Sequence, residues 1–144
     1  MGKKLIYPFT NYSNGHIRPF VPVRFINPIT NRHIEVNALL DTGADSCMLP
    51  RFIAEATGHD LKNINAKCTN TKGIAGIGLE CWEHTFNIEL ISPDGENTVW
   101  NSKPQLISCV DHDSAPPLLG TVQFLRHFKI RFNYRDGFIE IELP

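Results

Sequence analysis

The sequence predicts a mainly β protein with one or two short helices. Apolar and polar residues alternate over 21–27 and 33–40, the period of a strand that buries one face. The clearest helical signal is Arg51–Thr57, with Pro50 before it and Gly58 after it. Further strand-like runs separated by turn residues occur near 97–100, 105–110, 129–133 and 138–143.

The N-terminal part is expected to hold an arm and a hairpin. Residues 1–20 are mixed in character and predict an extended or irregular arm, followed by a single domain over 21–144. The alternating runs Val21–Asn27 and His33–Leu40 flank a turn, which predicts a hairpin. This hairpin would deliver Asp41 at its end.

Turn signals divide the remainder of the chain. Lys67–Leu90 predicts two extended arms around a glycine-rich tip, and Ser92-Pro93-Asp94-Gly95 predicts a tight turn after them. Thr121–Phe128 carries apolar residues at helical spacing, so we expect a second short helix there. Asp136-Gly137 lies between two alternating runs and predicts a closing hairpin.

Composition excludes several classes of function. The chain has 144 residues, 42% hydrophobic and 20% charged, which suits one compact domain. A formal net charge of −1 provides no surplus of cations for phosphates, so we expect no nucleic-acid partner. No apolar run approaches the roughly 20 residues of a membrane span, and the N-terminus lacks a signal-peptide core. We therefore expect a cytoplasmic protein with no membrane partner.

The cysteines give no metal-binding pattern. They stand at 47, 68, 81 and 109, without the close pairing typical of zinc ligands, so we expect neither a metal nor another cofactor. Asp111-His112-Asp113 groups three potential ligands, but neighbouring residues in a loop rarely share one ion. We interpret this cluster as a solvated loop.

One triplet carries the strongest chemical signal. Asp41-Thr42-Gly43 occurs once and directly follows an apolar strand. A carboxylate held in a tight turn at the end of a buried strand suits acid–base catalysis on a peptide bond. Its alternative reading is an ordinary strand-end turn, where Asp and Gly are favoured anyway. Because that chemistry needs two carboxylates, a single copy bears on oligomeric state too.

Two further motifs follow the triplet. Thr71–Leu79 alternates apolar residues with glycine, which weakens a packed strand but suits a hairpin tip able to close over a ligand. It matches neither a phosphate-binding loop nor a dinucleotide fingerprint. Pro117-Leu118-Leu119-Gly120 is an apolar run closed by glycine, and by itself indicates core packing.

Taken in order, these motifs resemble the retropepsins, the single-domain retroviral-type aspartic proteases. The resemblance covers about residues 20–133 and extends to a cellular or bacterial relative more than to a viral enzyme. It implies a closed, retropepsin-like acid-protease barrel with one lobe per chain. It also implies an aspartic endopeptidase that acts on a peptide or protein substrate as a homodimer, with its active site on the two-fold axis.

The resemblance assigns roles to individual residues. Asp41 is similar to the catalytic aspartate, Thr42 to the residue that links the two active-site loops, and Gly43 to a contact of the substrate backbone. Substrate binding would involve the residues after the triplet, the glycine-rich flap and the second apolar motif: Ala44, Asp45, Gly73, Ile74, Ala75, Gly76, Ile77, Gly78, Leu118 and Leu119. Because Ala44 has no hydroxyl to donate to the aspartate, we expect a mildly acidic optimum. An optimum below about pH 3 would contradict this.

The chain departs from the retropepsin pattern after Gly120, where the family has an arginine and this sequence continues Thr121-Val122. Arg126 and Arg51 are candidates to replace it. This departure leaves open a second function, a catalytically inactive retropepsin-fold module for peptide binding or dimerisation.

A third hypothesis is a cysteine hydrolase. It would use Cys47 as nucleophile with a histidine such as His84 or His127, and thiol-blocking reagents would distinguish it from an aspartic protease.

Overall fold

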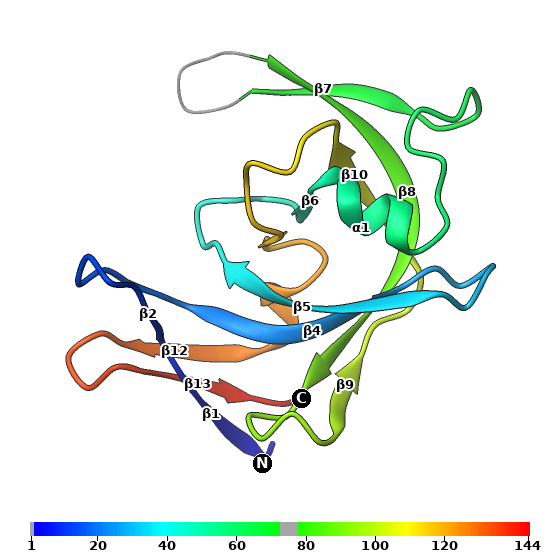
Figure 1. Cartoon of the computed structure of the whole chain (residues 1–144). Coiled ribbons are helices and arrows are strands. Elements are labelled where there is room, and N and C mark those ends of the chain that lie inside the picture. The colour runs from blue at the N-terminus through cyan, green and yellow to red at the C-terminus, as the bar shows by residue number, and fades with distance from the viewer. Residues whose placement is uncertain (1, 73–77) are drawn as a thin grey trace.

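The structure is a computed structural model that describes residues 2–72 and 78–144. It confirms the mainly β prediction, because strands are by far the commonest regular structure in the described chain (Figure 1). In chain order the elements are β1 (Lys4–Pro8), β2 (Thr10–Asn11), β3 (Ile17–Arg18), β4 (Phe20–Ile26), β5 (His33–Leu40), β6 (Met48–Leu49), α1 (Arg51–Ala56), β7 (Cys68–Lys72), β8 (Gly78–Ile91), β9 (Thr98–Asn101), β10 (Gln105–Val110), β11 (Leu118–Leu119), η1 (Leu125–His127), β12 (Lys129–Asn133) and β13 (Phe138–Glu142).

Strands β4 and β5 form the predicted hairpin. They pair antiparallel from Phe20 opposite Leu39 to Ile26 opposite His33. Val21, Val23 and Phe25 of β4 are fully buried, as the alternation predicts. The hairpin therefore fixes which face of β5 meets the core, and Asp41 follows directly after its last residue.

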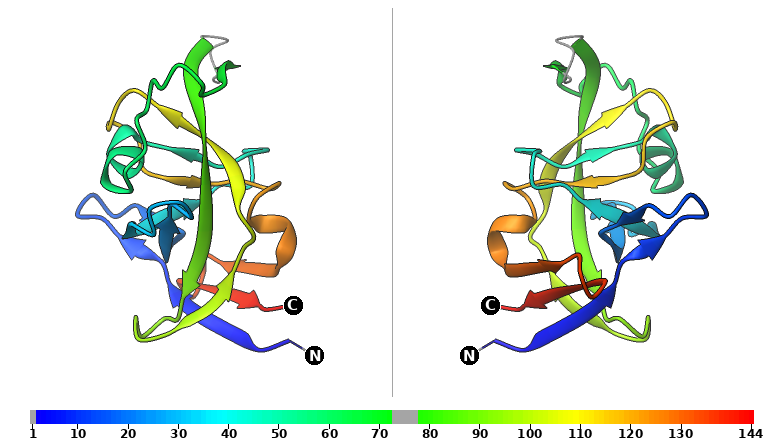
Figure 2. Two further views of the ribbon diagram at one scale, coloured as in Figure 1. Left: turned by 90° about the vertical axis from the view of Figure 1, so that its right-hand side faces the viewer. Right: turned by 90° about the vertical axis from the view of Figure 1, so that its left-hand side faces the viewer.

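Strand pairings run around the main sheet and return to their starting point. The order is β10-β6-β11-β5-β4-β8, and the long strand β8 also pairs with β10. Within β8, residues 81–86 pair with β10 and residues 87–90 pair with β4. Figure 2 shows β8 running along most of the length of the molecule. These pairings form the ring of a barrel whose interior is the hydrophobic core.

A second sheet joins the two ends of the chain. Its order is β1-β13-β12, and β1 pairs with β13 along its full length, from Lys4 opposite Glu142 to Pro8 opposite Phe138. The N- and C-termini consequently lie at the same end of the molecule (Figure 2). The predicted N-terminal arm thus contributes to the core through Leu5, Tyr7 and Phe9, which are buried with the barrel residues.

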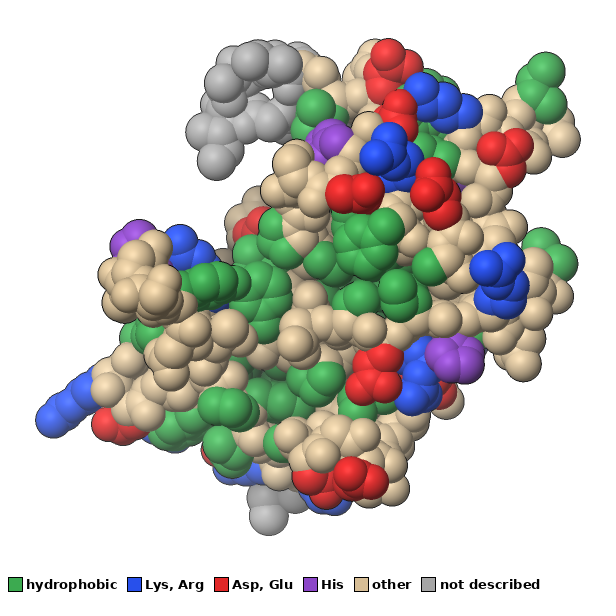
Figure 3. Space-filling model, in the orientation of Figure 1, with side chains coloured by type: hydrophobic (Ala, Val, Ile, Leu, Met, Phe, Trp, Pro, Cys, Tyr) green, Lys and Arg blue, Asp and Glu red, His purple; other side chains and the backbone are tan. Residues whose placement is uncertain are grey.

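The described chain contains a single α-helix, α1, where Pro50 and Gly58 predicted it. Pro50 occupies the position before the helix with φ −69°, and Gly58 follows it with φ +85°, a conformation that favours glycine. Charged side chains of both signs gather above α1 (Figure 3). Arg51 forms ion pairs with Asp111 at 3.2 Å and Asp113 at 3.4 Å, so these two carboxylates are exposed and paired with a cation.

The predicted helix over Thr121–Phe128 is wrong. Only the 3₁₀ turn Leu125–His127 forms within it. The N–H groups of Leu125 and Arg126 donate to carbonyls five residues back, and Phe124 has the non-helical angles φ −133° and ψ −65°. The Phe124 side chain is fully buried and packs edge-on against Trp100, and the backbone follows this packing instead of a helical path.

Among the described residues, no helix has the length and apolar character needed to cross a bilayer.

Candidate active site

Asp41 is held by backbone and side-chain contacts at the end of β5. Its N–H donates to the Leu119 carbonyl at 3.0 Å, which fixes the residue beside β11. Its carboxylate oxygen Oδ1 accepts the Gly43 N–H at 3.0 Å, and its carbonyl accepts the Ala44 N–H at 3.2 Å. The carboxylate is thereby oriented within a tight turn and remains half-buried.

Backbone groups of the segment after β11 hold the Asp41 loop, residues 41–47, in place. The N–H groups of Thr121 and Val122 donate to the carbonyls of Ala44 at 2.9 Å and Asp45 at 2.8 Å. The Gly120 N–H also points to the sulfur of Cys47, at 3.3 Å. Hydrogen bonds therefore join the two segments, and at Gly120 the backbone passes close to the Asp41 loop.

The outer surface of the Asp41 loop faces solvent. Thr42, Gly43, Asp45 and Ser46 are exposed, while Ala44 is half-buried. A polar, exposed loop that carries an oriented carboxylate offers a surface for a substrate or a second protein.

Leu118 and Leu119 lie beside this loop in β11. This short strand pairs parallel with the end of β5 and antiparallel with β6. Leu119 is fully buried and belongs to the core, whereas Leu118 is half-buried. The structure therefore brings the second apolar motif next to the Asp41 triplet. Just after this motif, the Thr121 hydroxyl contacts the Ala44 carbonyl at 3.3 Å, although the two residues are 77 positions apart in the sequence.

The glycine-rich hairpin is described only in its arms. Strands β7 and β8 pair from Cys68 opposite Trp82 to Lys72 opposite Gly78, and they extend from the barrel on the side where the Asp41 loop lies (Figure 1). Gly78 is exposed at the start of β8. The other predicted flap residues lie outside the described residues: Gly73, Ile74, Ala75, Gly76 and Ile77.

One polar contact to the Asp41 loop, made by Gln123, escaped the sequence analysis, and neither candidate arginine contacts this loop. Gln123 is buried, and its Oε1 accepts the Cys47 N–H at 2.8 Å. Arg51 is engaged with acidic residues near α1, and Arg126 is exposed. No local pattern distinguishes Gln123, because its partner Cys47 lies 76 positions away in the sequence.

The cysteine-hydrolase hypothesis finds no support in the geometry. Cys47 is buried, and burial raises the pKa of its thiol to about 11. His84 uses Nε2 to contact the Leu61 carbonyl at 2.8 Å, and His127 packs against Trp100. A protonated thiol without an imidazole partner is a poor nucleophile.

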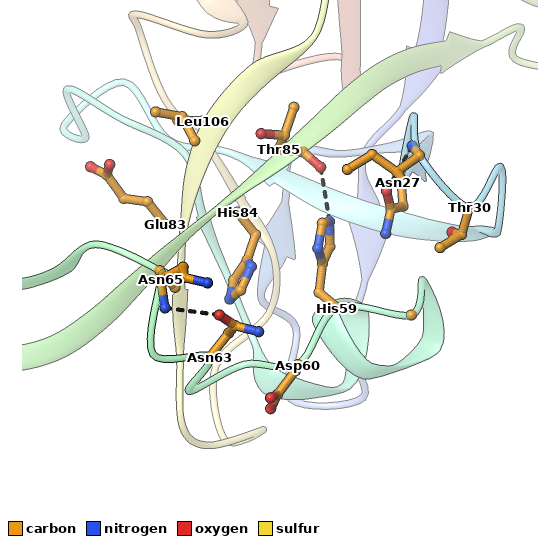
Figure 4. Close-up of a pocket in the computed structure, with 13 residues that line it drawn as sticks. Asn27, Thr30, His59, Asp60, Asn63, Asn65, Glu83, His84, Thr85 and Leu106 are labelled. Atoms are coloured by element: carbon orange, nitrogen blue, oxygen red, sulfur yellow. Dashed lines mark hydrogen bonds between the residues drawn. The ribbon is translucent and has the colours of Figure 1, made fainter.

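A cavity of about 480 Å³ is lined by none of the residues predicted for the aspartic-protease site. Its wall includes His59 and His84, whose ring centroids lie 4.7 Å apart with the rings tilted by 37°. His59 Nε2 contacts the Thr85 carbonyl at 2.9 Å (Figure 4). In the described part of the chain, no three His, Cys, Asp or Glu side chains gather where they could hold a metal ion.

Comparisons with known proteins identify the fold. A retropepsin-like aspartic protease from Rickettsia conorii superposes with a TM-score of 0.67 and 19% identity, over 99% of this chain and 92% of that chain. The EIAV protease complexed with the inhibitor HBY-793 gives a TM-score of 0.51 and 19% identity, over 77% of this chain and 88% of that chain. No family model and no curated protein sequence matches. The fold-level resemblance to retropepsins is thereby confirmed.

Proposed function

We propose that this protein is an aspartic endopeptidase that acts as a homodimer, each chain supplying one Asp41 to a shared site. The observation that carries the proposal is the setting of Asp41 on a retropepsin-like fold. It is half-buried at a strand end, and the Gly43 N–H orients its carboxylate. Since the motif occurs once in the sequence, a second chain must provide the second carboxylate.

Two facing carboxylates dictate the chemistry. At about 3 Å and an effective dielectric of about 20, two full charges repel by roughly 5–6 kcal/mol, so the pair retains one proton. The ionised member removes a proton from a water, which attacks the scissile carbonyl, while the protonated member donates to the carbonyl oxygen. The roles then reverse to protonate the leaving amine. This sequence needs neither a covalent intermediate nor a metal.

The substrate is proposed to bind as an extended peptide. It would lie between the exposed backbone near Asp45 and the hairpin of β7 and β8, adding a strand with side chains that alternate between pockets. The half-buried Leu118 would supply an apolar wall. The substrate-binding residues proposed from the sequence remain Ala44, Asp45, Gly73, Ile74, Ala75, Gly76, Ile77, Gly78 and Leu118. Leu119, also proposed from the sequence, is fully buried and would support this wall from the core.

The second chain is proposed to meet the exposed side of the Asp41 loop. Thr42 is exposed there and would link the two loops through its hydroxyl. Strands β1 and β13 are already paired with each other inside one chain, so exchange of terminal strands is not needed to complete the fold.

The Asp41→Asn variant tests this proposal. An asparagine oxygen still accepts the Gly43 N–H, so the loop and the dimer should persist while cleavage of a mixed peptide library between pH 3 and 8 is lost. Asp60→Asn is the matched control, because Asp60 lines the cavity beside His59 and His84 and its replacement should leave cleavage unchanged. Cleavage that persists in Asp41→Asn would refute the mechanism. Activity per chain should also fall on dilution below the dimer dissociation constant.

One observation favours a second candidate, an inactive peptide-binding or dimerisation module. The position beside the catalytic loop that bears an arginine in retropepsins has no cation here, and the neutral Gln123 contacts the loop instead. A stable dimer by analytical ultracentrifugation with no library product at any pH from 3 to 8 would support this function over proteolysis.

A further inference from the structure

We propose that Gln123 is the positioning residue that holds the Asp41 loop in its working geometry. This inference rests on the proposed function, since it assigns the support of the same site. Gln123 would thereby support the Asp41 loop in a chain that lacks the arginine that retropepsins have after the matching glycine.

All three polar groups that Gln123 offers beyond its own N–H are used. Its side-chain Oε1 accepts the Cys47 N–H at 2.8 Å, and its Nε2 donates to the Leu106 carbonyl at 3.3 Å. Its backbone carbonyl accepts the side chain of Gln105 at 3.1 Å. Gln123 is 9% exposed, so water offers little replacement for these contacts.

The two side-chain partners fix the orientation of the amide. A backbone N–H can only donate and a backbone carbonyl can only accept, so the oxygen must face Cys47 and the nitrogen must face Leu106. The side chain therefore bridges the end of the Asp41 loop to strand β10. The other contacts described above that hold this loop come from residues 119–122, through their backbone groups and the Thr121 hydroxyl.

This arrangement places Gln123 where it acts through the loop. Asp41 and Cys47 are the two ends of the same loop, and Leu119 and Gln123 hold them, respectively. If the Cys47 end moves, the turn that orients the carboxylate loses its anchor at that end. Displacements of about 1 Å remote from the reacting atoms can lower turnover by about a hundredfold.

A neutral amide has a property that an arginine lacks: a protonated carboxyl group can imitate it. Protonated glutamic acid offers one acceptor and one donor, whereas an ionised carboxylate only accepts and leaves the Leu106 carbonyl unpaired. Gln123→Glu should therefore behave like the wild type at low pH and fail at higher pH. Burial would keep the introduced carboxyl protonated above its usual range.

The test compares Gln123→Glu, Gln123→Leu and the control Gln105→Leu, which removes only the contact to the Gln123 backbone. We expect Gln123→Glu to match wild-type turnover within about threefold at the acid end, then to lose kcat about tenfold or more as pH rises, with little change in KM. The pH profile of the wild-type kcat should not show this additional decrease. A Gln123→Glu profile that parallels the wild type at every pH, or a folded Gln123→Leu with wild-type kcat, would overturn the proposal.

A second measurement does not depend on proteolysis. Hydrogen exchange of the Cys47 amide should be faster in Gln123→Leu at neutral pH and unchanged in Gln105→Leu. In Gln123→Glu it should match the wild type at acid pH. It should be faster than in the wild type at neutral pH, because the Leu106 carbonyl oxygen repels the ionised carboxylate and moves it from its place. If the wild type cleaves no peptide, the proposed function fails while this measurement still decides whether Gln123 holds the loop. Unchanged exchange in every Gln123 variant would refute the support itself.

Discussion

A Cβ atom added to Gly120 would lie 2.5 Å from the carbonyl oxygen of Ser46 and 2.9 Å from that of Ala44. Both obstacles are backbone atoms, so neither can rotate away. Gly120 is therefore required by the close crossing of the two segments that build the Asp41 loop.

Replacement of this glycine should destabilise the whole protein. We expect Gly120→Ala to lower the free energy of unfolding by about 3 kcal/mol or more, measured by urea titration, because the backbone must separate. Gly15→Ala is the control. Gly15 has φ +82° but open space around it, so its replacement should cost only about 1–2 kcal/mol. Equal losses in the two variants would contradict the predicted crossing.

Strand β1 should contribute to global stability. The buried Tyr7 hydroxyl donates to the Ile91 carbonyl at 2.7 Å, which joins the terminal sheet to the end of β8. Tyr7→Phe leaves this carbonyl without its partner, and we expect a loss of about 1–3 kcal/mol in thermal or urea unfolding. The exposed Tyr134 provides the matched control, for which Tyr134→Phe should change stability by less than about 0.5 kcal/mol. A loss of stability in Tyr7→Phe no larger than that in Tyr134→Phe would contradict this contact.

Buried thiols should make the protein sensitive to alkali. Burial raises the pKa of Cys47 to about 11 and that of Cys109 to about 12, from 9.0 in an unfolded chain. The folded state then retains protons that the unfolded state releases, so stability is complete below pH 9 and falls as pH rises towards 11. The expected slope is about 1.4 kcal/mol per pH unit for each thiol. Urea midpoints between pH 8.5 and 10.5 measure it.

The variant Cys109→Val removes one of these thiols, so its loss of stability with rising pH should be the part due to Cys47 alone. Burial also raises the pKa of the Tyr7 hydroxyl, which adds to the loss above pH 10. A stability curve that is flat from pH 8.5 to 10.5 would show that the thiols are hydrated.

His59 should make the fold sensitive to acid. Burial lowers its pKa below 6.5, opposed by its contact with the Thr85 carbonyl and assisted by the adjacent His84. The unfolded chain gains a proton near pH 6.5 while the folded chain resists it, so stability falls as pH decreases from 6.5. The His59→Gln variant should reduce the drop in urea midpoint between pH 7.5 and 5, whereas His33→Gln, at an exposed position, should not. An equal drop in both variants would refute the assignment to His59.

The sequence allowed the local elements to be predicted because their causes are local. Alternation in β4 and β5, Pro50 and Gly58 around α1, and Asp136-Gly137 before β13 each act within a few residues. The position of Asp41 at a strand end follows from the same patterns.

The support of the site could not be predicted, because it depends on contacts between distant segments. Gln123 is an unremarkable residue in a segment whose apolar spacing suggested a helix, and only the partner Cys47 gives it a role. The packing of Phe124 against Trp100 likewise overrides the helical pattern. The missing arginine signalled a change at this place without indicating its replacement.

The hydrogen bonds between the Asp41 loop and residues 119–123 determine when the loop can become ordered during biosynthesis. A nascent chain displays its aspartate long before the ribosome releases Gln123, 76 positions after Cys47. Contacts of such large sequence separation form late and slowly. A partly synthesised chain therefore contains Asp41 without residues 119–123, which hold its loop. Any catalytic activity would require the complete fold.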